Sequence, residues 1–169
     1  MIYLMILLLF IIIILIVLYF GKKPKIHRNV SHKDLKKFLE VLLYRGYENG
    51  FMVIQVPIDR KFKRFIQFSK YIEDNKNVGL EFHYPLSEWS KSYYKKLKDI
   101  LIKNQIKFEI ETTGDEKIPE FLVIDVKKNL DMADRISKLV FREIYEIGEE
   151  VMIELYYHNI SPREEKIGF

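Results

Sequence analysis

Two polar side chains on one predicted strand could do chemistry together. Glu81 and His83 are two residues apart in the alternating stretch 78–84, so both should point to the same side of that strand. Carboxylate and imidazole groups serve as metal ligands and as proton donors or acceptors. His158, which follows two tyrosines near the end of the chain, is a third group that could meet them. Such a site needs several groups to converge, which one strand cannot impose, so an exposed polar strand face is the competing interpretation.

Asp125 is a further candidate for acid–base chemistry. It interrupts the apolar run 121–126, and a carboxylate at the end of a central strand can open onto a catalytic cleft. It can equally be the first polar residue of the turn that follows the strand, and this is the interpretation we favour. The other histidines, His27 and His32, lie in or beside a predicted linker, where we expect them to be solvated.

The motifs of the common enzyme classes are absent from the sequence. No glycine-rich phosphate loop, G-x-G-x-x-G, G-x-S-x-G or H-E-x-x-H pattern occurs. The sequence has no cysteine, which excludes disulfides, thiolate catalysis and cysteine-ligated zinc. We therefore expect no cofactor or metal and a binding role. The alternative is an enzyme whose polar site, near Glu81, His83 and Asp125, matches none of the common catalytic motifs.

A basic and aromatic stretch, Lys61-Phe62-Lys63-Arg64-Phe65, is the pattern nearest to nucleic-acid binding. Sheets that recognise RNA stack bases on aromatic side chains and place basic residues between them. Aromatic residues make up 14% of this chain, however, and aromatic side chains in strands usually pack in the core. A membrane-tethered nucleic-acid binder is therefore a third hypothesis, and we do not expect nucleic acid to be the partner.

Residues 1–20 contain no charged side chain and read MIYLMILLLFIIIILIVLYF. A helix of this length spans about 30 Å, which is the thickness of the hydrocarbon core of a bilayer. A cleaved signal peptide is the alternative, but this run is too long, no basic residue precedes it, and no small-residue cleavage site follows it. We predict an uncleaved transmembrane helix that anchors a single-pass membrane protein.

A basic cluster follows the predicted anchor and sets its orientation. Lys22, Lys23, Lys25 and Arg28 have no acid among them, and the rest of the chain balances 24 bases with 24 acids. Such a cluster favours the cytoplasmic side of the membrane and can touch the anionic headgroups of the lipid bilayer. Because Pro24 interrupts any continuous helix, residues 21–30 are predicted to be a linker to a cytoplasmic C-terminal domain.

Residues 31–160 have the patterns of one small folded domain, followed by a tail at 161–169. Apolar residues recur at helical spacing over 31–45, 88–104 and 129–147, with Ser31, Ser87 and Asn129 as N-caps. In the last helix the predicted buried face consists of Met132, Ile136, Leu139, Val140 and Ile144. Strands are predicted at 51–56, 62–73, 78–84, 106–111 and 120–126, with one more at 150–157.

Strands in pairs separated by helices predict an α+β fold. We expect a two-layer domain with a mainly antiparallel sheet and about three helices, either ferredoxin-like or related to that fold. The nearly continuous apolar run 120–126 suggests a central strand. An anchor, a complete small domain and no catalytic signature together predict a scaffold or accessory subunit of a membrane-associated assembly, with another protein as its partner.

Overall fold

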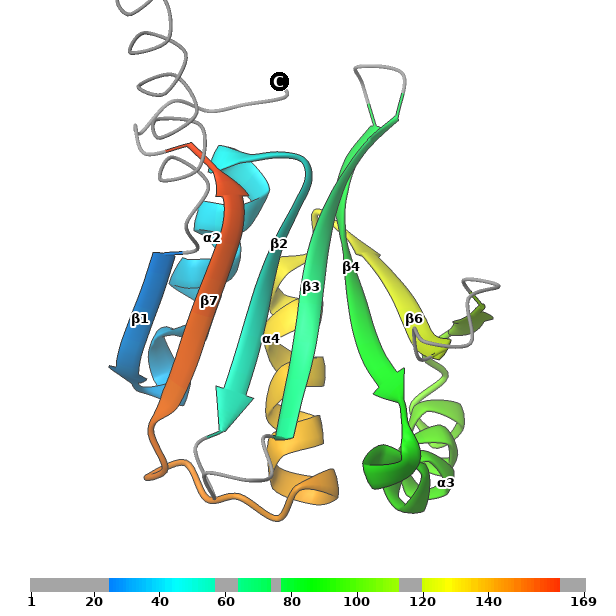
Figure 1. The fold of residues 1–169 in the computed structure, drawn as a ribbon. Helices are drawn as coiled ribbons and strands as arrows, with labels where there is room; N and C mark the ends of the chain where they lie inside the picture. The colour runs from blue at the N-terminus through cyan, green and yellow to red at the C-terminus, as the bar shows by residue number, and fades with distance from the viewer. Residues whose placement is uncertain (1–24, 57–63, 74–76, 113–119, 162–169) are drawn as a thin grey trace, which may run out of the picture.

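The computed structural model describes residues 25–56, 64–73, 77–112 and 120–161 (Figure 1). Within these ranges no helix is long and apolar enough to cross a membrane. The predicted anchor, residues 1–20, lies outside the described residues, as do Lys22 and Lys23 of the basic cluster and the tail after residue 161.

A seven-stranded, fully antiparallel sheet organises the domain, in the order β1-β7-β2-β3-β4-β6-β5. The centre of the sheet is the meander β2-β3-β4, whose strands follow one another in the chain. The first and last strands pair with each other at one side. The strands are β1 (Lys25–Val30), β2 (Gly46–Val56), β3 (Arg64–Glu73), β4 (Asn77–Leu86), β5 (Glu109–Glu111), β6 (Glu120–Lys127) and β7 (Ile153–Ile160).

Three helices form the second layer, and α2 (Leu35–Arg45) and α4 (Leu130–Leu139) lie across the same face of the sheet (Figure 1). The third helix, α3 (Glu88–Lys103), begins where β4 ends, and its predicted cap Ser87 is part of a capping box with Ser90. Asn129 caps α4 by accepting a hydrogen bond from the Met132 amide at 2.9 Å. A 3-10 turn, η1 (His32–Asp34), precedes α2, and a π-helical turn, η2 (Val140–Ile144), continues α4. The α+β fold with a mainly antiparallel sheet and three helices is thus confirmed.

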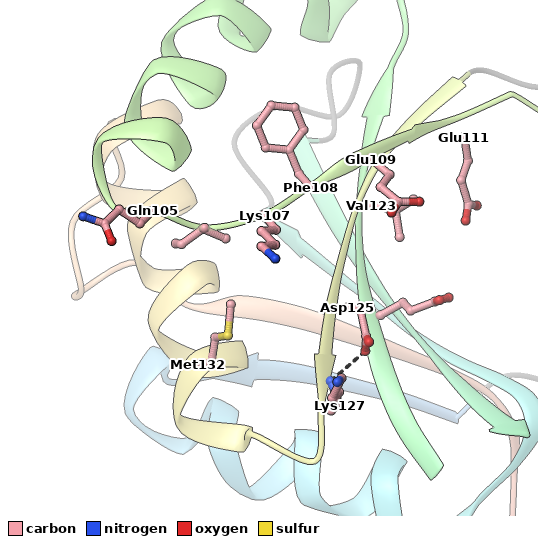
Figure 2. A pocket seen from close by; sticks show the side chains of 11 residues that line it. Gln105, Lys107, Phe108, Glu109, Glu111, Val123, Asp125, Lys127 and Met132 are labelled. Carbon is pink, nitrogen blue, oxygen red and sulfur yellow. Dashed lines mark hydrogen bonds between the residues drawn. The ribbon is translucent and has the colours of Figure 1, made fainter. Parts of the chain in front are cut away.

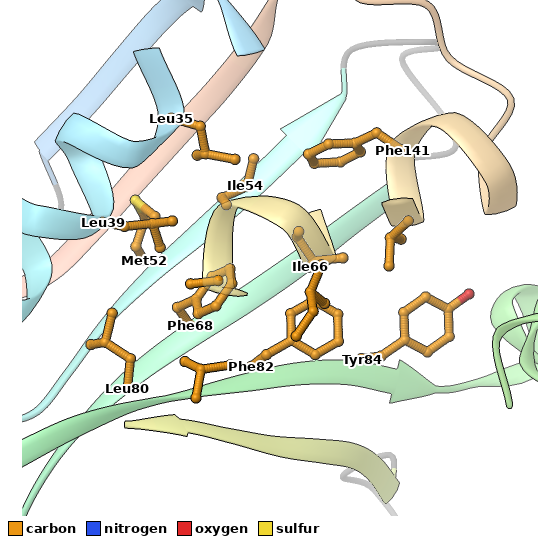
Figure 3. Close-up of a cluster of buried hydrophobic side chains, with 14 of the residues drawn as sticks. Leu35, Leu39, Met52, Ile54, Ile66, Phe68, Leu80, Phe82, Tyr84 and Phe141 are labelled. Atoms are coloured by element: carbon orange, nitrogen blue, oxygen red, sulfur yellow. The ribbon is translucent and has the colours of Figure 1, made fainter. Parts of the chain in front are cut away.

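The core lies between this helical layer and the sheet. Side chains at alternate strand positions face it, because successive residues of a strand point to opposite sides. Ile54, Phe68 and Phe82, on the three central strands, are fully buried, and the last two rings meet edge to face with centroids 5.4 Å apart. Figure 3 shows these side chains converging with Leu39 of α2 and Phe141 of η2. The apolar alternation of the strands therefore has a direct cause in the one-sided helical cover.

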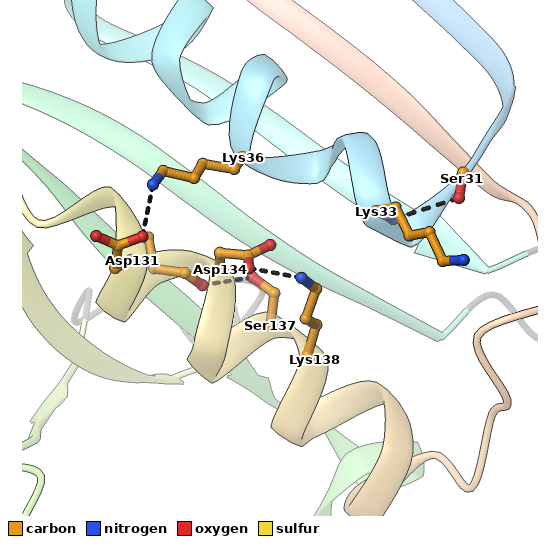
Figure 4. Close-up of polar contacts among 8 residues, drawn as sticks. Ser31, Lys33, Lys36, Asp131, Asp134, Ser137 and Lys138 are labelled. Carbon is orange, nitrogen blue, oxygen red and sulfur yellow. Dashed lines mark hydrogen bonds and ion pairs between the residues drawn. The ribbon is translucent and has the colours of Figure 1, made fainter.

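Exposed polar contacts join α2 to α4 above the core (Figure 4). The Lys36 ammonium lies 2.5 Å from a carboxylate oxygen of Asp131, and Lys138 pairs with Asp134 within α4 at 2.7 Å. The Lys36 pair is solvent-exposed, so it is expected to add at most about 1 kcal/mol, and the Lys138 pair is half-buried and lies within one helix. Apolar packing, not charge, holds the two helices on the sheet.

The predicted linker is wrong over residues 25–30. These residues form β1, which pairs with β7 through Lys25–Tyr157 and Ile26–Tyr156. Lys25 and Arg28 of the basic cluster therefore belong to a strand of the domain. The segment looks like a linker because β1 is an outer strand, where few side chains are buried and apolar alternation is not required.

Three smaller predictions also differ from the structure. The strand β6 is not central but second from the edge, covered on one side only by the three-residue β5. In α4 the fully buried positions include Ala133 and Ser137, whereas Met132 and Leu139 are half-buried. The element order, with three strands between the first two long helices, departs from the βαββαβ pattern of a ferredoxin-like fold.

Candidate functional site: the open face of the sheet

One face of the sheet is covered by a described helix only at the end of β3, where Trp89 of α3 meets Phe65, and we call it the open face. Cross-strand register arranges its side chains in rows, because directly paired residues point the same way. The first row runs from β7 to β6 and the second spans all seven strands. The rows are His158-Phe51-Ser69-Glu81-Asp125 and Ile26-Tyr156-Val53-Gln67-His83-Val123-Glu109.

The β7–β2 half of the open face is apolar and aromatic. The Phe51 ring stacks on the His158 ring with centroids 5.0 Å apart and an interplanar angle of 26°. Val53 and Tyr156, paired in the next row, are half-buried although no described helix lies above them. Ile26 at the edge is 46% exposed. These side chains together offer a partly hydrated apolar surface.

The β3–β4–β6 half of the open face is polar, and it contains all three residues of the predicted polar site. The Ser69 hydroxyl and the His83 Nε2 atom lie 2.6 Å apart. A carboxylate oxygen of Glu81 lies 3.6 Å from the same nitrogen, which confirms that Glu81 and His83 share a strand side. Asp125 is paired with Glu81 across β4 and β6. Ser69, which contacts His83, was not among the predicted residues.

Asp125 has two partners, which explains its place at the end of an apolar strand. Its Oδ1 atom accepts hydrogen bonds from the Lys127 amide at 2.9 Å and from the Tyr71 hydroxyl at 3.0 Å. The first bond is the turn role that the sequence suggested. Burial, with the Asp125 carboxylate as the next cause, raises the pKa of Tyr71 to about 12. Tyr71 is therefore a hydrogen-bond donor throughout the physiological pH range.

Gly79 makes room for Tyr71. The two residues are paired across β3 and β4, and the Tyr71 ring lies directly over Gly79. A methyl group built on Gly79 would collide with the ring carbons and hydroxyl of Tyr71. The glycine therefore lets the tyrosine lie flat along the sheet and reach Asp125.

A groove of about 810 Å³ borders the polar half at the outer side of β6 (Figure 2). It forms because β5 pairs with β6 only from Phe121 to Val123, so the rest of β6 has no described neighbour on that side. Four carboxylates line it, together with Lys107, Lys127 and the apolar side chains of Phe108, Val123 and Met132. The carboxylates belong to Glu81, Glu109, Glu111 and Asp125.

The geometry of these groups does not suit nucleophilic catalysis. In a serine–histidine–acid triad the serine and the acid bind opposite nitrogens of the imidazole. Here Ser69 and Glu81 both lie against Nε2 of His83. Moreover, β3 is paired on both sides, so the amides near Ser69 take part in the sheet and cannot stabilise an oxyanion. No group of three or more acidic or histidine side chains among the described residues is placed to hold a metal ion.

The other histidines are spread over the domain. His158 is separated from His83 by three strand spacings, about 14 Å, so the predicted convergence does not occur. His32, expected to be solvated, is only 2% exposed and packs 5.0 Å from the Phe141 ring. Burial lowers the pKa of His32, which is therefore a neutral core residue. His27 is exposed, as expected, and contacts Phe38.

The basic and aromatic stretch at 61–65 is divided by the fold. Residues 61–63 lie outside the described residues. Arg64 points to the helical side, where its guanidinium donates a hydrogen bond to the Tyr145 carbonyl at 2.5 Å and lies over the Tyr93 ring. Phe65 contacts Trp89 at the end of β3. Neither described residue contributes a positive charge to the open face.

No protein-family model matches this chain, and comparisons with curated proteins and with solved structures found no match. The chemistry of the open face therefore provides the evidence for function.

Proposed function

We propose that the chain is a membrane-anchored binding domain, a scaffold or accessory subunit that uses the open face to bind a protein. The observation that carries this proposal is the open face itself: a wide antiparallel sheet whose exposed side combines half-buried aromatic rings with exchangeable polar groups. Protein interfaces are enriched in aromatic side chains of this kind. A sheet with one side covered by helices has no structural need for aromatic residues on its other side.

The membrane part of the proposal rests on the sequence of residues 1–20 and on the basic cluster that follows it. A single uncleaved helix would hold the domain at the bilayer, and Lys22 and Lys23 would favour the cytoplasmic side and contact anionic lipid headgroups. Alkaline carbonate extraction of the full chain should leave it in the membrane fraction. Recovery of a mature protein that begins after residue 20 would reject the anchor, and digestion of the domain by protease outside sealed cells would reject the cytoplasmic side.

The experiment for the binding role is site-specific photo-crosslinking of the full chain in its native membrane. A photoreactive residue at Val53, in the middle of the open face, should form an adduct with one protein. The same group at exposed Lys98, on α3, should not. The captured protein is then purified and its affinity for the full chain measured directly.

A blocking variant makes this test specific to the face. Gln67→Arg places a long side chain at the centre of the open face, and it should abolish both the adduct and the affinity. Ser92→Arg makes the same change of charge at an exposed position on α3 and should have no effect. Equal binding by both variants would show that the partner lies elsewhere and would reject the proposal.

Hydrolysis is the alternative that the geometry disfavours, although Ser69 and His83 lie 2.6 Å apart as in activated serines. A fluorophosphonate probe distinguishes the two functions. We expect no labelling of the wild-type chain; labelling that disappears in Ser69→Ala would favour the enzyme.

A further inference from the structure

The open face carries an excess of acidic side chains. Strand pairing places six carboxylates on this face or along its outer strands. They belong to Glu73, Glu81, Glu109, Glu111, Asp125 and Glu154. The described bases of the central strand β3, Arg64 and Lys70, both lie on the helical side. Three described lysines border these carboxylates, and they are Lys107, Lys127 and Lys128, so the acids exceed the bases. A chain whose net charge is +4 therefore keeps one negatively charged surface.

This charge selects the class of partner. Phosphate groups would be repelled by this face, since nucleic-acid-binding surfaces neutralise phosphates with lysine and arginine. A cationic protein segment is attracted instead, and complementary charge both speeds association and excludes wrong partners.

The apolar half fixes the second property of that segment. Phe51, Val53 and Tyr156 lie immediately beside the acidic half, so a partner must present apolar side chains next to basic ones. The strands between β7 and β6 already have neighbours on both sides and offer no free edge for an added strand. Recognition must therefore occur through side chains on the surface of the sheet.

The width of the face fits a helix. From β7 to β6 it spans four strand spacings, about 19 Å, whereas a helix with its side chains is about 10–12 Å across. A helix lying along β2 and β3 would cover the apolar half with one stripe. Its flank would carry lysine or arginine over Glu81 and Asp125 and into the groove beside β6, whose apolar wall of Val123 and Phe108 suits their aliphatic stems.

We propose that the partner segment is a cationic amphipathic helix, with its apolar stripe on the β7–β2 half and its basic flank on the acidic half of the open face. This inference rests on the proposed function and names the chemistry of its partner. It predicts that affinity depends on Glu81 and Asp125 and falls as the salt concentration rises.

The test uses the full chain in phosphatidylcholine nanodiscs and two labelled synthetic peptides. One has leucine at i, i+3, i+4 and i+7 and lysine elsewhere; the other has glutamate in place of every lysine. Anisotropy is corrected for binding to empty nanodiscs. The lysine peptide should bind and the glutamate peptide should not. The double variant Glu81→Gln/Asp125→Asn should bind the lysine peptide about tenfold more weakly.

A matched control removes two negative charges from the helical layer. Glu40→Gln/Asp99→Asn changes exposed positions on α2 and α3 and should leave the affinity within about twofold of the wild type. Trp89 fluorescence confirms that each variant is folded, since this ring packs against Phe65 and Tyr145.

The outcomes separate this inference from the proposed function. If Gln67→Arg blocks the lysine peptide but the loss of Glu81 and Asp125 does not weaken it, the face binds through apolar contact and the cationic partner is rejected. Equal binding of the two peptides, binding of an oligouridine, or equal losses in the double variant and its control would also overturn it. A crosslink from Val53 to a protein would still support the proposed function in each case.

Discussion

Polar side chains have different kinds of hydrogen-bond partner on the two sides of the central strands. On the helical side, the hydroxyls of Tyr145 and Tyr157 donate to the backbone carbonyls of Phe65 and Phe38 at 2.8 and 2.7 Å. On the open face, Ser69 pairs with His83 and Tyr71 with Asp125, so side chains satisfy other side chains. Backbone acceptors are fixed, whereas side chains rotate. The hydrogen bonds of the helical side are therefore fixed. Those within the open face can be exchanged for hydrogen bonds to a partner.

The largest difference is expected between two phenylalanines on neighbouring strands. Phe82 of β4 is fully buried on the helical side, and Phe121 of β6 is half-buried on the open face. Phe82→Ala should lower the free energy of unfolding by about 3–5 kcal/mol, the usual effect of removing a core aromatic ring. Phe121→Ala should lower it by about 1 kcal/mol, because its ring loses only part of a full burial. Urea unfolding followed by Trp89 fluorescence measures both, and equal losses would mean that the open face is covered.

A second pair compares polar residues on β3. Arg64→Ala removes the hydrogen bond to the Tyr145 carbonyl and the contacts with two tyrosine rings, and it should lower the stability by about 2 kcal/mol. Gln67→Ala, on the open face, should stay within about 0.5 kcal/mol. The same urea titration measures the loss of stability in both variants. A small effect of Arg64→Ala would show that the hydrogen bond from Arg64 to the Tyr145 carbonyl does not stabilise the end of η2.

Two serines give a smaller contrast. Ser90 is fully buried, and its hydroxyl accepts from the Ser87 amide at 2.8 Å at the start of α3. Ser90→Ala should cost about 1 kcal/mol, as is usual for a lost helix cap. Ser69→Ala should change the stability by less than about 0.5 kcal/mol, because the Glu81 carboxylate lies 3.6 Å from the same His83 nitrogen and can replace the lost partner. A larger loss of stability from Ser69→Ala than from Ser90→Ala would show that the hydrogen bonds of the open face stabilise the fold more than those of the helical side.

The smallest effect concerns the ionisation of Tyr71. Because its pKa is raised to about 12 in the folded chain, the unfolded chain loses this proton first, at about pH 10. Its contribution to stability is therefore complete below pH 10 and is lost as the pH rises towards 12. NMR of ring-labelled tyrosine, assigned with Tyr71→Phe, follows the titration. Asp125→Asn should bring the pKa of Tyr71 closer to 10, and an unchanged value would leave burial as the whole cause.

Local chemistry made part of this structure predictable. Ser87 and Asn129 cap helices in the structure as they do in the sequence pattern, because a cap depends only on residues within one turn. Glu81 and His83 were placed on one side of a strand by their spacing alone. Ser69 and Tyr71 alternate in the same way within the predicted strand 62–73, and they could have been proposed had the register with β4 been known.

Pairing between distant segments was not predictable. The residues of β1 gave no strand signal because they are ordered by β7, which lies more than a hundred residues later in the chain. The π-helical turn η2 likewise follows from packing, since Phe141 and Ile144 enter the core from it. The polar and acidic nature of the open face emerges only when the rows of five strands are aligned, which no single stretch of sequence contains.

The pairing of the first and last strands also determines when each strand can find its neighbour during synthesis. The strand β7 sits between β1 and β2, so neither acquires this neighbour until residue 160 has left the ribosome. Until then β1 and one side of β2 offer unpaired backbone groups to any other extended chain. Contacts across so long a stretch also close slowly. We therefore expect chains cut short before Ile153 to aggregate even when α2, α3 and α4 are complete, and a chaperone that binds nascent chains to act on β1 and β2 before β7 is synthesised.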